Sequence, residues 1–280
     1  MPSRLLALAL AGAVLLTGCS SEQAPATTDG TLRERAAALV EVVRAAVEQA
    51  KEAQVEQTGP VDSRSPGEEP VIRTDTRTEF DYAEYSGTVQ DVLGSLDQYW
   101  SEALPGEFGV AYTPPERFVY YRPEEGPGPS CGEQEAPPKN AFYCPVGDFI
   151  AWDESGLLIP YYVSSGDFAA AFVLAHEFGH AMQARLPRQE ELGVLRELQA
   201  DCFAGAWAAW VSQRGYLEAG DLDDATLAVF TARDVPGTDF TDPRAHGSGF
   251  ERTRAFADGY ESGPGRCAPA PAEDWIVDQR

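Results

Sequence analysis

The sequence predicts an α+β protein that is mainly helical and carries a small β-sheet. Two long segments with helical spacing of apolar residues dominate the second half of the chain. One ends at Pro187, and the other runs from about Glu190 to Arg214. Two short runs, at 117–121 and 148–152, have the β-branched and aromatic composition of strands. A chain of 280 residues can bury one large core and still carry appendages.

The first residues predict export. Arg4 precedes an apolar run from Leu5 to Leu16, which is too short to span a bilayer and suits a signal peptide. The Leu-Thr-Gly-Cys that follows resembles the lipobox of bacterial lipoproteins, which implies removal of residues 1–18 and lipidation of Cys19. The alternative is an ordinary signal peptide with an incidental cysteine. We expect a lipoprotein on the outer face of a membrane, at the cell surface or in the periplasm.

Composition divides the rest of the chain into four parts. Residues 19–30 are small and polar, as in a tether. Residues 31–57 carry an apolar stripe at helical spacing and predict a helix that either docks on the main domain or stands as a stalk. Glycine and proline mark 58–70 as a linker, so 71–280 is expected to be the main domain.

Three further helices are expected in the main domain. The first is capped by Ser86 or Thr88 and runs to about Leu104. Shorter helices follow near 224–232 and 249–260. The formal net charge of −24 does not favour binding to nucleic acid, so the acidic side chains are expected to serve solubility.

Four cysteines remain if Cys19 carries lipid, and an even number in an exported protein indicates two disulfides. Three connectivities are possible. We favour Cys131–Cys144, which closes a short loop with glycine and proline, and this leaves Cys202–Cys267 by elimination. A free thiol at Cys202 is the alternative for the second pair. A zinc–cysteine cluster is disfavoured because no C-x2-C motif occurs.

The first of the two long helices carries two histidines. Ser164 and Asp167 are spaced like a capping box at its start. His176 and His180 lie one turn apart on one face, which suits two nitrogens that share a zinc ion. Glu177 is rotated from them and can reach a water in an open coordination position. This is the HExxH arrangement of zinc peptidases, and the alternative is a helix with two ordinary histidines.

The third ligand decides between these readings. The residues after His180 lack the glycine and histidine of the three-histidine sites, so the ligand must come from a later segment. Glu197 and Asp201 lie one turn apart on the second long helix, among nearly continuous apolar residues. Buried carboxylates are costly unless they are paired or bind a metal. We therefore predict that Glu197 binds the metal and that Asp201 accepts the N–H of a ligand histidine.

These segments together resemble the bacterial neutral zinc metallopeptidases. The resemblance rests on HEFGH, ELQADCFAGAW, DPRAHGSGFERTRAFADGY at 242–260 and FYCPVGDFIAWD at 142–153, and it spans about residues 85–262. It implies a zincin-like fold with an active-site helix and a second ligand-bearing helix, one zinc ion and peptide hydrolysis. The connection from His180 to Glu197, 16 residues, is shorter than expected for much of the family. The N-terminal helix lies outside the resemblance.

The remaining histidine, His246, is a second candidate catalytic residue. A histidine placed beyond the third ligand could donate a hydrogen bond to the oxyanion that forms when water adds to a peptide carbonyl. A helix cap or a packing role is an equal alternative for His246. Arg252 is as well explained by a structural ion pair, and Tyr143 and Tyr260 are weaker candidates.

The sequence thus predicts a lipid-anchored zinc metalloendopeptidase of the gluzincin type, with a peptide or protein substrate. His176, His180 and Glu197 would hold the zinc, and Glu177 would be the general base. A zinc amidase that acts on a cell-wall peptide would share this chemistry. The alternative from another class is a catalytically inactive surface lipoprotein, which would use the scaffold and the helix at 31–57 to bind a partner.

Overall fold

A computed structural model describes residues 32–52 and 80–267 of the protein. The predicted signal peptide, the lipidation site Cys19, the tether at 19–30 and the linker at 58–70 lie outside the described residues. None of the described helices combines the length and the apolarity that a membrane span requires.

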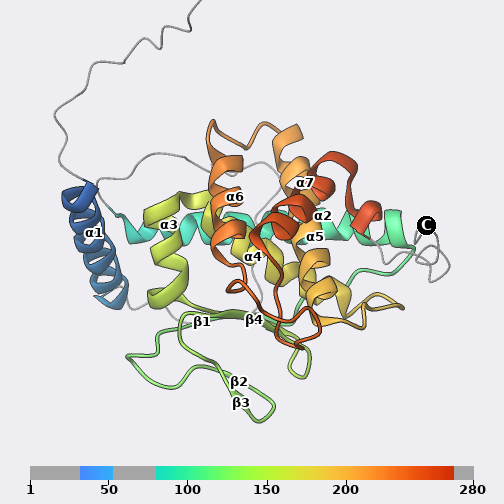
Figure 1. The fold of residues 1–280 in the computed structure, drawn as a ribbon, viewed down its shortest axis with the longest axis horizontal. Helices are drawn as coiled ribbons and strands as arrows, with labels where there is room; N and C mark the ends of the chain where they lie inside the picture. Colours follow the sequence, from blue (N-terminus) through green and yellow to red (C-terminus); the bar gives the residue numbers. More distant parts are fainter. Residues whose placement is uncertain (1–31, 53–79, 268–280) are drawn as a thin grey trace, which may run out of the picture.

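The described chain is mainly helical with a small sheet, which confirms the predicted fold class (Figure 1). The α-helices are α1 (Leu32–Glu52), α2 (Tyr82–Phe108), α3 (Ile159–Ser165), α4 (Asp167–Gln183), α5 (Gly193–Gln213), α6 (Asp221–Thr231) and α7 (Gly249–Ser262). A π-helical turn, η1 (Glu154–Leu158), precedes α3, and a 3-10 turn, η2 (Pro264–Cys267), follows α7. The strands are β1 (Arg117–Tyr121), β2 (Ser130–Cys131), β3 (Gln134–Glu135), β4 (Ala141–Cys144) and β5 (Phe149–Asp153).

Three strands form one sheet in the order β1-β5-β4. β1 runs parallel to β5, and β4 pairs antiparallel with its other side. Every residue of β5 is buried, as expected for a central strand, whereas β4 lies at an edge. The short β2–β3 hairpin is tied to β4 by the predicted disulfide Cys131–Cys144.

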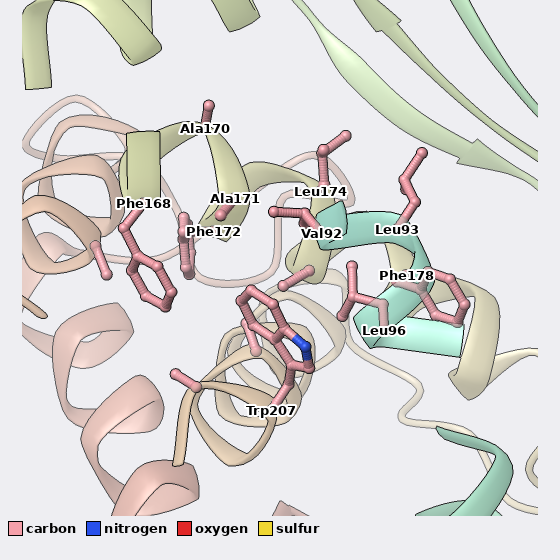
Figure 2. Close-up of a cluster of buried hydrophobic side chains, with 14 of the residues drawn as sticks. Val92, Leu93, Leu96, Phe168, Ala170, Ala171, Phe172, Leu174, Phe178 and Trp207 are labelled. Carbon is pink, nitrogen blue, oxygen red and sulfur yellow. The ribbon is translucent and has the colours of Figure 1, made fainter. Parts of the chain in front are cut away.

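The core lies where α4 meets α2, α5 and α6 (Figure 2). α4 is buried along nearly its whole length, so it is apolar on almost every side. The rings of Phe168 on α4 and Trp207 on α5 stack with centroids 5.6 Å apart. The indole N–H of Trp207 donates to the hydroxyl of Ser95 on α2, so a polar group inside this core has its partner.

α5 and α7 pack with their backbones in contact. Gly205 faces the carbonyl of Phe256, and Gly259 faces the carbonyl of Cys202. A Cβ atom at either glycine would overlap these carbonyl groups, so no larger residue fits without moving the helices apart. This close approach fixes α7 against the helix that carries the predicted third ligand.

The N-terminal helix docks on the main domain. α1 lies beside α3 in Figure 1, and Ala46 and Ala50 are fully buried. Gln49 accepts the backbone N–H of Tyr82 through its side-chain oxygen. Of the two arrangements left open for this segment, a docked helix and a stalk, the described part shows the docked one.

The predicted capping box before α4 is wrong. Ser164 lies inside α3, and the N-cap of α4 is Gly166, whose φ of 100° turns the chain sharply between the two helices. Asp167 is the first residue of α4, and its side chain is fully buried. The capping box requires an extended N-cap serine, and here a glycine makes the break instead.

Two helix boundaries also differ from expectation. α2 begins at Tyr82, because Asp81 caps it by accepting the N–H groups of residues 83 and 84, and it continues to Phe108. α4 ends at Gln183, before the proline at 187. The apolar pattern located both helices, but the side-chain caps and the last turns set their ends.

Candidate metal centre

The site forms where α4 and α5 approach closely. Gly179 on α4 faces Ala200 on α5, and a Cβ at Gly179 would lie 3.2 Å from the Cα of Ala200. The absence of a side chain lets the two helices pack near the positions of His176, His180 and Glu197. A sequence feature inside the HEFGH motif therefore helps to bring the third residue to the first two.

Three donor atoms converge between these helices. The Nε2 atoms of His176 and His180 lie 3.1 Å apart. Glu197 Oε2 lies 3.2 Å from His176 Nε2, and its other carboxylate oxygen, Oε1, lies 3.4 Å from His180 Nε2. Ligands about 2.05 Å from a tetrahedral zinc ion lie about 3.3 Å from each other, so the two imidazoles and the carboxylate approach one another at the spacing that zinc needs. The predicted set fits the metal in spacing and in donor chemistry.

The outer side of His176 is held by a buried ion pair. Its Nδ1 lies 2.8 Å from the carboxylate of Asp201, as the sequence predicts for an orienting acid. Arg252 donates to both oxygens of Asp201 at 2.8 Å, and it donates a third bond to the carbonyl of Ala232. Asp201 is 0% exposed and Arg252 is 2% exposed. The structural ion pair that was one of two readings for Arg252 is present.

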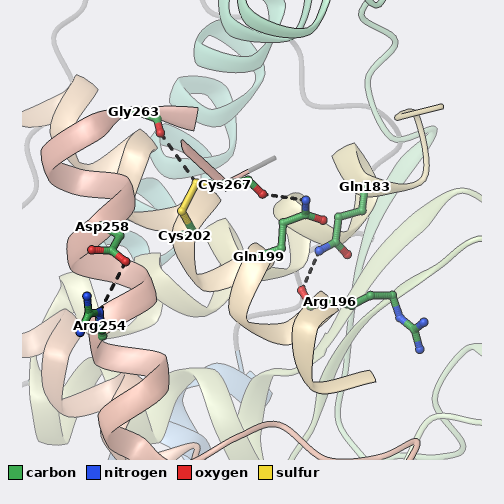
Figure 3. Close-up of a disulfide and its surroundings, with 8 residues drawn as sticks. All are labelled: Gln183, Arg196, Gln199, Cys202, Arg254, Asp258, Gly263 and Cys267. Carbon is green, nitrogen blue, oxygen red and sulfur yellow. Dashed lines mark hydrogen bonds and ion pairs between the residues drawn. A yellow bond between two sulfur atoms is a disulfide. The ribbon is translucent and has the colours of Figure 1, made fainter. Parts of the chain in front are cut away.

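Sequence reasoning missed the partner of His180. Its Nδ1 lies 2.8 Å from the side-chain oxygen of Gln183. The amide nitrogen of Gln183 donates to the carbonyl of Arg196 on α5 at 2.6 Å, as Figure 3 shows. Since Gln183 follows His180 by three residues on the same helix, the spacing was a usable signal. Both histidines therefore have Nδ1 engaged and Nε2 turned toward Glu197.

The charges at the site favour a cation. Burial lowers the pKa of His176, but Asp201 and Glu197 outweigh burial and raise that pKa to about 10. Burial raises the pKa of Glu197, but the two histidines hold it well below its usual value. Arg252 likewise outweighs burial and lowers the pKa of Asp201. The donor set is thus stabilised by positive charge, which a metal ion also supplies.

A cavity of about 650 Å³ opens onto these donors. Glu177 lines it, is 7% exposed and receives no hydrogen bond from any described side chain. Strand β4 borders the same cavity through Ala141, Phe142 and Tyr143. The cavity therefore combines an unengaged carboxylate, the edge of a sheet and the three converging donors.

His246 lies on the loop between α6 and α7 and lines this cavity. Asp234 holds the loop, because its carboxylate accepts the backbone N–H groups of His246 and Gly247 at 2.8 Å. The imidazole is half exposed, with Nδ1 3.5 Å from Asp234. The structure brings His246 to the cavity without any hydrogen bond to the three described donors.

The two tyrosine candidates are engaged elsewhere. Tyr143 lines the cavity, but its hydroxyl donates to Asp148 at 2.7 Å. Tyr260 is not among the residues that line the described cavity, and its hydroxyl donates to Ser212. Tyr260 is therefore not a candidate for the site.

The second predicted disulfide, Cys202–Cys267, is formed next to the site (Figure 3). It joins α5, one residue after Asp201, to η2. Gln199 adds a hydrogen bond from its amide to the carbonyl of Cys267 at 2.8 Å. The free-thiol alternative for Cys202 is wrong, and the segment that bears Glu197 and Asp201 is attached to the end of the described chain.

The fold and the site define an α+β protein with an HExxH helix and a carboxylate from a second helix, the arrangement of zinc peptidases. The chain belongs to the family described as "Putative neutral zinc metallopeptidase", which matches residues 38–269. The match includes most of α1, so the expectation that the N-terminal helix lies outside the resemblance is wrong. Ala46 and Ala50, which are buried against the main domain, lie inside the matched range.

Curated relatives match the chain over about two thirds of its length. The chain is 32% identical over 200 residues to "Uncharacterized protein YpfJ" of Escherichia coli, covering 63% of this chain and 68% of the relative. It is 32% identical over 211 residues to "Uncharacterized protein Rv2575" of Mycobacterium tuberculosis, covering 64% and 69%. No solved structure matches the chain.

Proposed function

We propose that the protein is a zinc-dependent endopeptidase, with zinc held by His176, His180 and Glu197 and with Glu177 as the general base. The observation that carries this proposal is the convergence of two imidazoles and one carboxylate, whose nearest atoms lie 3.1 to 3.4 Å apart, at a cavity that Glu177 also lines. Family membership supports the same class of activity.

When bound, zinc supplies a Lewis acid that polarises a carbonyl and lowers the pKa of water towards about 7. The chain's own part is to orient the ligands. Asp201 and Gln183 engage the Nδ1 atoms of the two histidines, which keeps each Nε2 available toward the centre of the site. Arg252 keeps Asp201 charged, so the orienting acid stays an acceptor.

Glu177 moves the proton in this proposal. It follows His176 directly, so its carboxylate enters the same cavity from the same helix. In this proposal it accepts the proton of the attacking water and passes it to the leaving amine. His246, held by Asp234, donates to the developing oxyanion from the opposite loop.

The edge of the sheet supports a peptide as the substrate. Within the described residues β4 pairs only with β5, so its outer edge carries backbone groups that can pair with an extended chain. Because β4 borders the cavity, a peptide added there as a strand would pass beside the donors. The lipobox supports the further proposal that Cys19 anchors this peptidase to the outer face of a membrane.

The test is Glu177→Gln, with Glu191→Gln as the matched control because Glu191 is exposed and does not line the cavity. Zinc content and cleavage of a diverse peptide library are measured for both variants and for the wild type. Glu177→Gln should keep one zinc per chain and lose about 10²- to 10⁴-fold in kcat/KM, while Glu191→Gln stays unchanged. Undiminished cleavage by Glu177→Gln would remove Glu177 as the base.

The same measurements address the alternative of a non-catalytic binding protein. Full zinc content in the wild type, together with no cleavage anywhere in the library, would favour partner binding over hydrolysis. Cell-wall peptides are tested beside the library, and products from these peptides alone would favour the amidase reading of the same site.

A further inference from the structure

A second cluster of acidic side chains lies at the other end of α4. Asp167 is the first residue of α4, and Asp221 and Asp224 lie in the first turn of α6. One carboxylate oxygen of each lies within 4.8 Å of the other two. Asp167 and Asp221 are both 0% exposed, whereas Asp224 is partly exposed. The cluster therefore reaches solvent only through Asp224.

Asp221 has one oxygen without a partner. Its Oδ2 accepts the backbone N–H of Glu218 at 2.7 Å. Its Oδ1 is fully buried and receives no hydrogen bond. In the described part of the chain, no lysine or arginine forms an ion pair with Asp221 or Asp224. A buried carboxylate oxygen without a donor is costly, and its position among other carboxylates points to a missing cation.

Packing places the Asp224 carboxylate against the N-cap residue of α4. The carboxylate of Asp224 lies against the Cα of Gly166, the N-cap of α4, and a Cβ there would overlap it. Gly166 also has a φ of 100°, which only glycine adopts readily. The break before α4 is thus shaped to receive this carboxylate.

We propose that Asp167, Asp221 and Asp224 form a calcium site that fastens the start of α4 to the start of α6. Carboxylate oxygens are the ligands that Ca²⁺ prefers, and two oxygens bound to one Ca²⁺ at about 2.4 Å can be up to about 4.8 Å apart. Mg²⁺, with bonds of about 2.1 Å, requires a tighter octahedron. Water that enters beside Asp224 would complete the coordination.

The calcium site is separate from the proposed zinc site. Asp167 precedes His176 by nine residues, which is about 13 Å along the helix. The role that follows is structural: the ion would hold the helix that carries the HEFGH motif against α6. This inference does not depend on peptidase activity.

The test measures the thermal midpoint of the zinc-saturated full chain as CaCl₂ is added at constant ionic strength, with MgCl₂ in parallel. Wild type is compared with Asp221→Asn, Asp224→Asn and the control Asp223→Asn. Asp223 lies in the same turn of α6 but is exposed and outside the cluster, so it matches the charge change. Calorimetric titration of the wild type gives the calcium stoichiometry.

Calcium at about 100 times its Kd should raise the midpoint of the wild type and of Asp223→Asn by roughly 5–10 °C. Asp221→Asn and Asp224→Asn should lose this rise, and the wild type should bind one calcium per chain more tightly than magnesium. The partly exposed Asp224 carries the test if Asp221→Asn does not fold. An equal rise of the thermal midpoint in all four proteins would mean that calcium acts on the acidic surface in general. No rise in the wild type would mean that the three carboxyl groups share protons instead of a calcium ion. Either result overturns the proposal.

Discussion

Each end of α4 carries a cluster of three potential metal ligands. The two clusters differ in whether their ligand atoms have hydrogen-bond partners. At the C-terminal end, His176, His180 and Glu197 converge, and each histidine has an outer partner. At the N-terminal end, Asp167 and Asp221 meet a third carboxylate, and one oxygen of Asp221 has no donor. The ligands of the first cluster are already oriented for a metal, whereas the second cluster holds a buried oxygen that a cation could bind.

The difference teaches how a site can be recognised without its ion. Mixed nitrogen and oxygen donors with engaged outer atoms indicate zinc, because the protein has fixed the orientation of each ligand. A buried set of carboxylates indicates calcium only when the packing holds it together and a donor is missing. If the two clusters are independent metal sites, the loss of one should leave the metal response of the other unchanged.

The largest effect is expected from Glu197→Ala. Removal of the only carboxylate among the three donors should reduce zinc from one per chain to less than about 0.1 after dialysis, since structural and catalytic sites need at least three protein ligands. The calcium-dependent rise of the thermal midpoint should remain. Asp224→Asn should show the reverse, with full zinc and no calcium response. Metal analysis and thermal unfolding check both, and zinc retention by Glu197→Ala would exclude Glu197 as a ligand.

Arg252→Met comes next. It leaves Asp201 buried without its cation, which should lower the free energy of unfolding by about 3–5 kcal/mol. Arg244→Met is the control, because the Arg244 side chain is 89% exposed and should change stability by less than about 0.5 kcal/mol. Urea denaturation of the zinc-free proteins measures both values. Similar losses in the two variants would show that the buried pair carries no special weight.

Gln183→Leu should weaken zinc binding by about 10- to 100-fold, because His180 loses the partner that orients its ring. Gln199→Leu is the matched control: Gln199 is also a buried glutamine, but it bonds to Cys267 rather than to a histidine. Competition with a zinc chelator measures the affinities. An equal loss in both variants would assign the effect to general destabilisation of the helices.

The smallest effect concerns pH. Burial, with Asp167 and Asp223 nearby, raises the pKa of Asp224 to about 6. A raised pKa means that the protonated form stabilises the fold below about pH 4, and that this stability is lost as pH rises through about 6. Without divalent ions, Asp224→Asn should therefore gain on the wild type by about 1 kcal/mol between pH 4.5 and pH 7, discounted for partial exposure. Parallel denaturation curves at the two pH values check it, and a constant difference would contradict it.

The proposed zinc site could be predicted from the sequence because its parts are local. The spacing of His176 and His180 needs one helix, and Glu197 and Asp201 stand out as acids in an apolar segment. The fold class and both disulfides were likewise predicted. Gln183 was missed because a glutamine near the end of a helix is ordinary until its two contacts are known.

The acidic cluster could not be predicted from the sequence. Asp167 and Asp221 lie more than fifty residues apart, and each is a common residue in the first turn of a helix. The predicted capping box of Ser164 with Asp167 was wrong for a similar reason. The spacing of the two residues fits a cap, but the tertiary structure places Ser164 inside α3 and makes Gly166 the N-cap of α4. The sequence also did not decide whether α1 docks on the main domain or stands as a stalk. An apolar stripe predicts that a helix face is buried, but it does not identify the surface that covers it.

The disulfide Cys202–Cys267 has a consequence for a chain exposed to proteases. It spans a sequence separation of 65 residues, and the exposed loop that carries His246 lies within that span. A backbone cut in this loop would leave the two fragments joined through the cystine, with α7 still packed on α5. Nicked protein should therefore run as one band on a gel without reductant and as two with it, while Arg252 on α7 stays attached to the fragment that carries the proposed ligands.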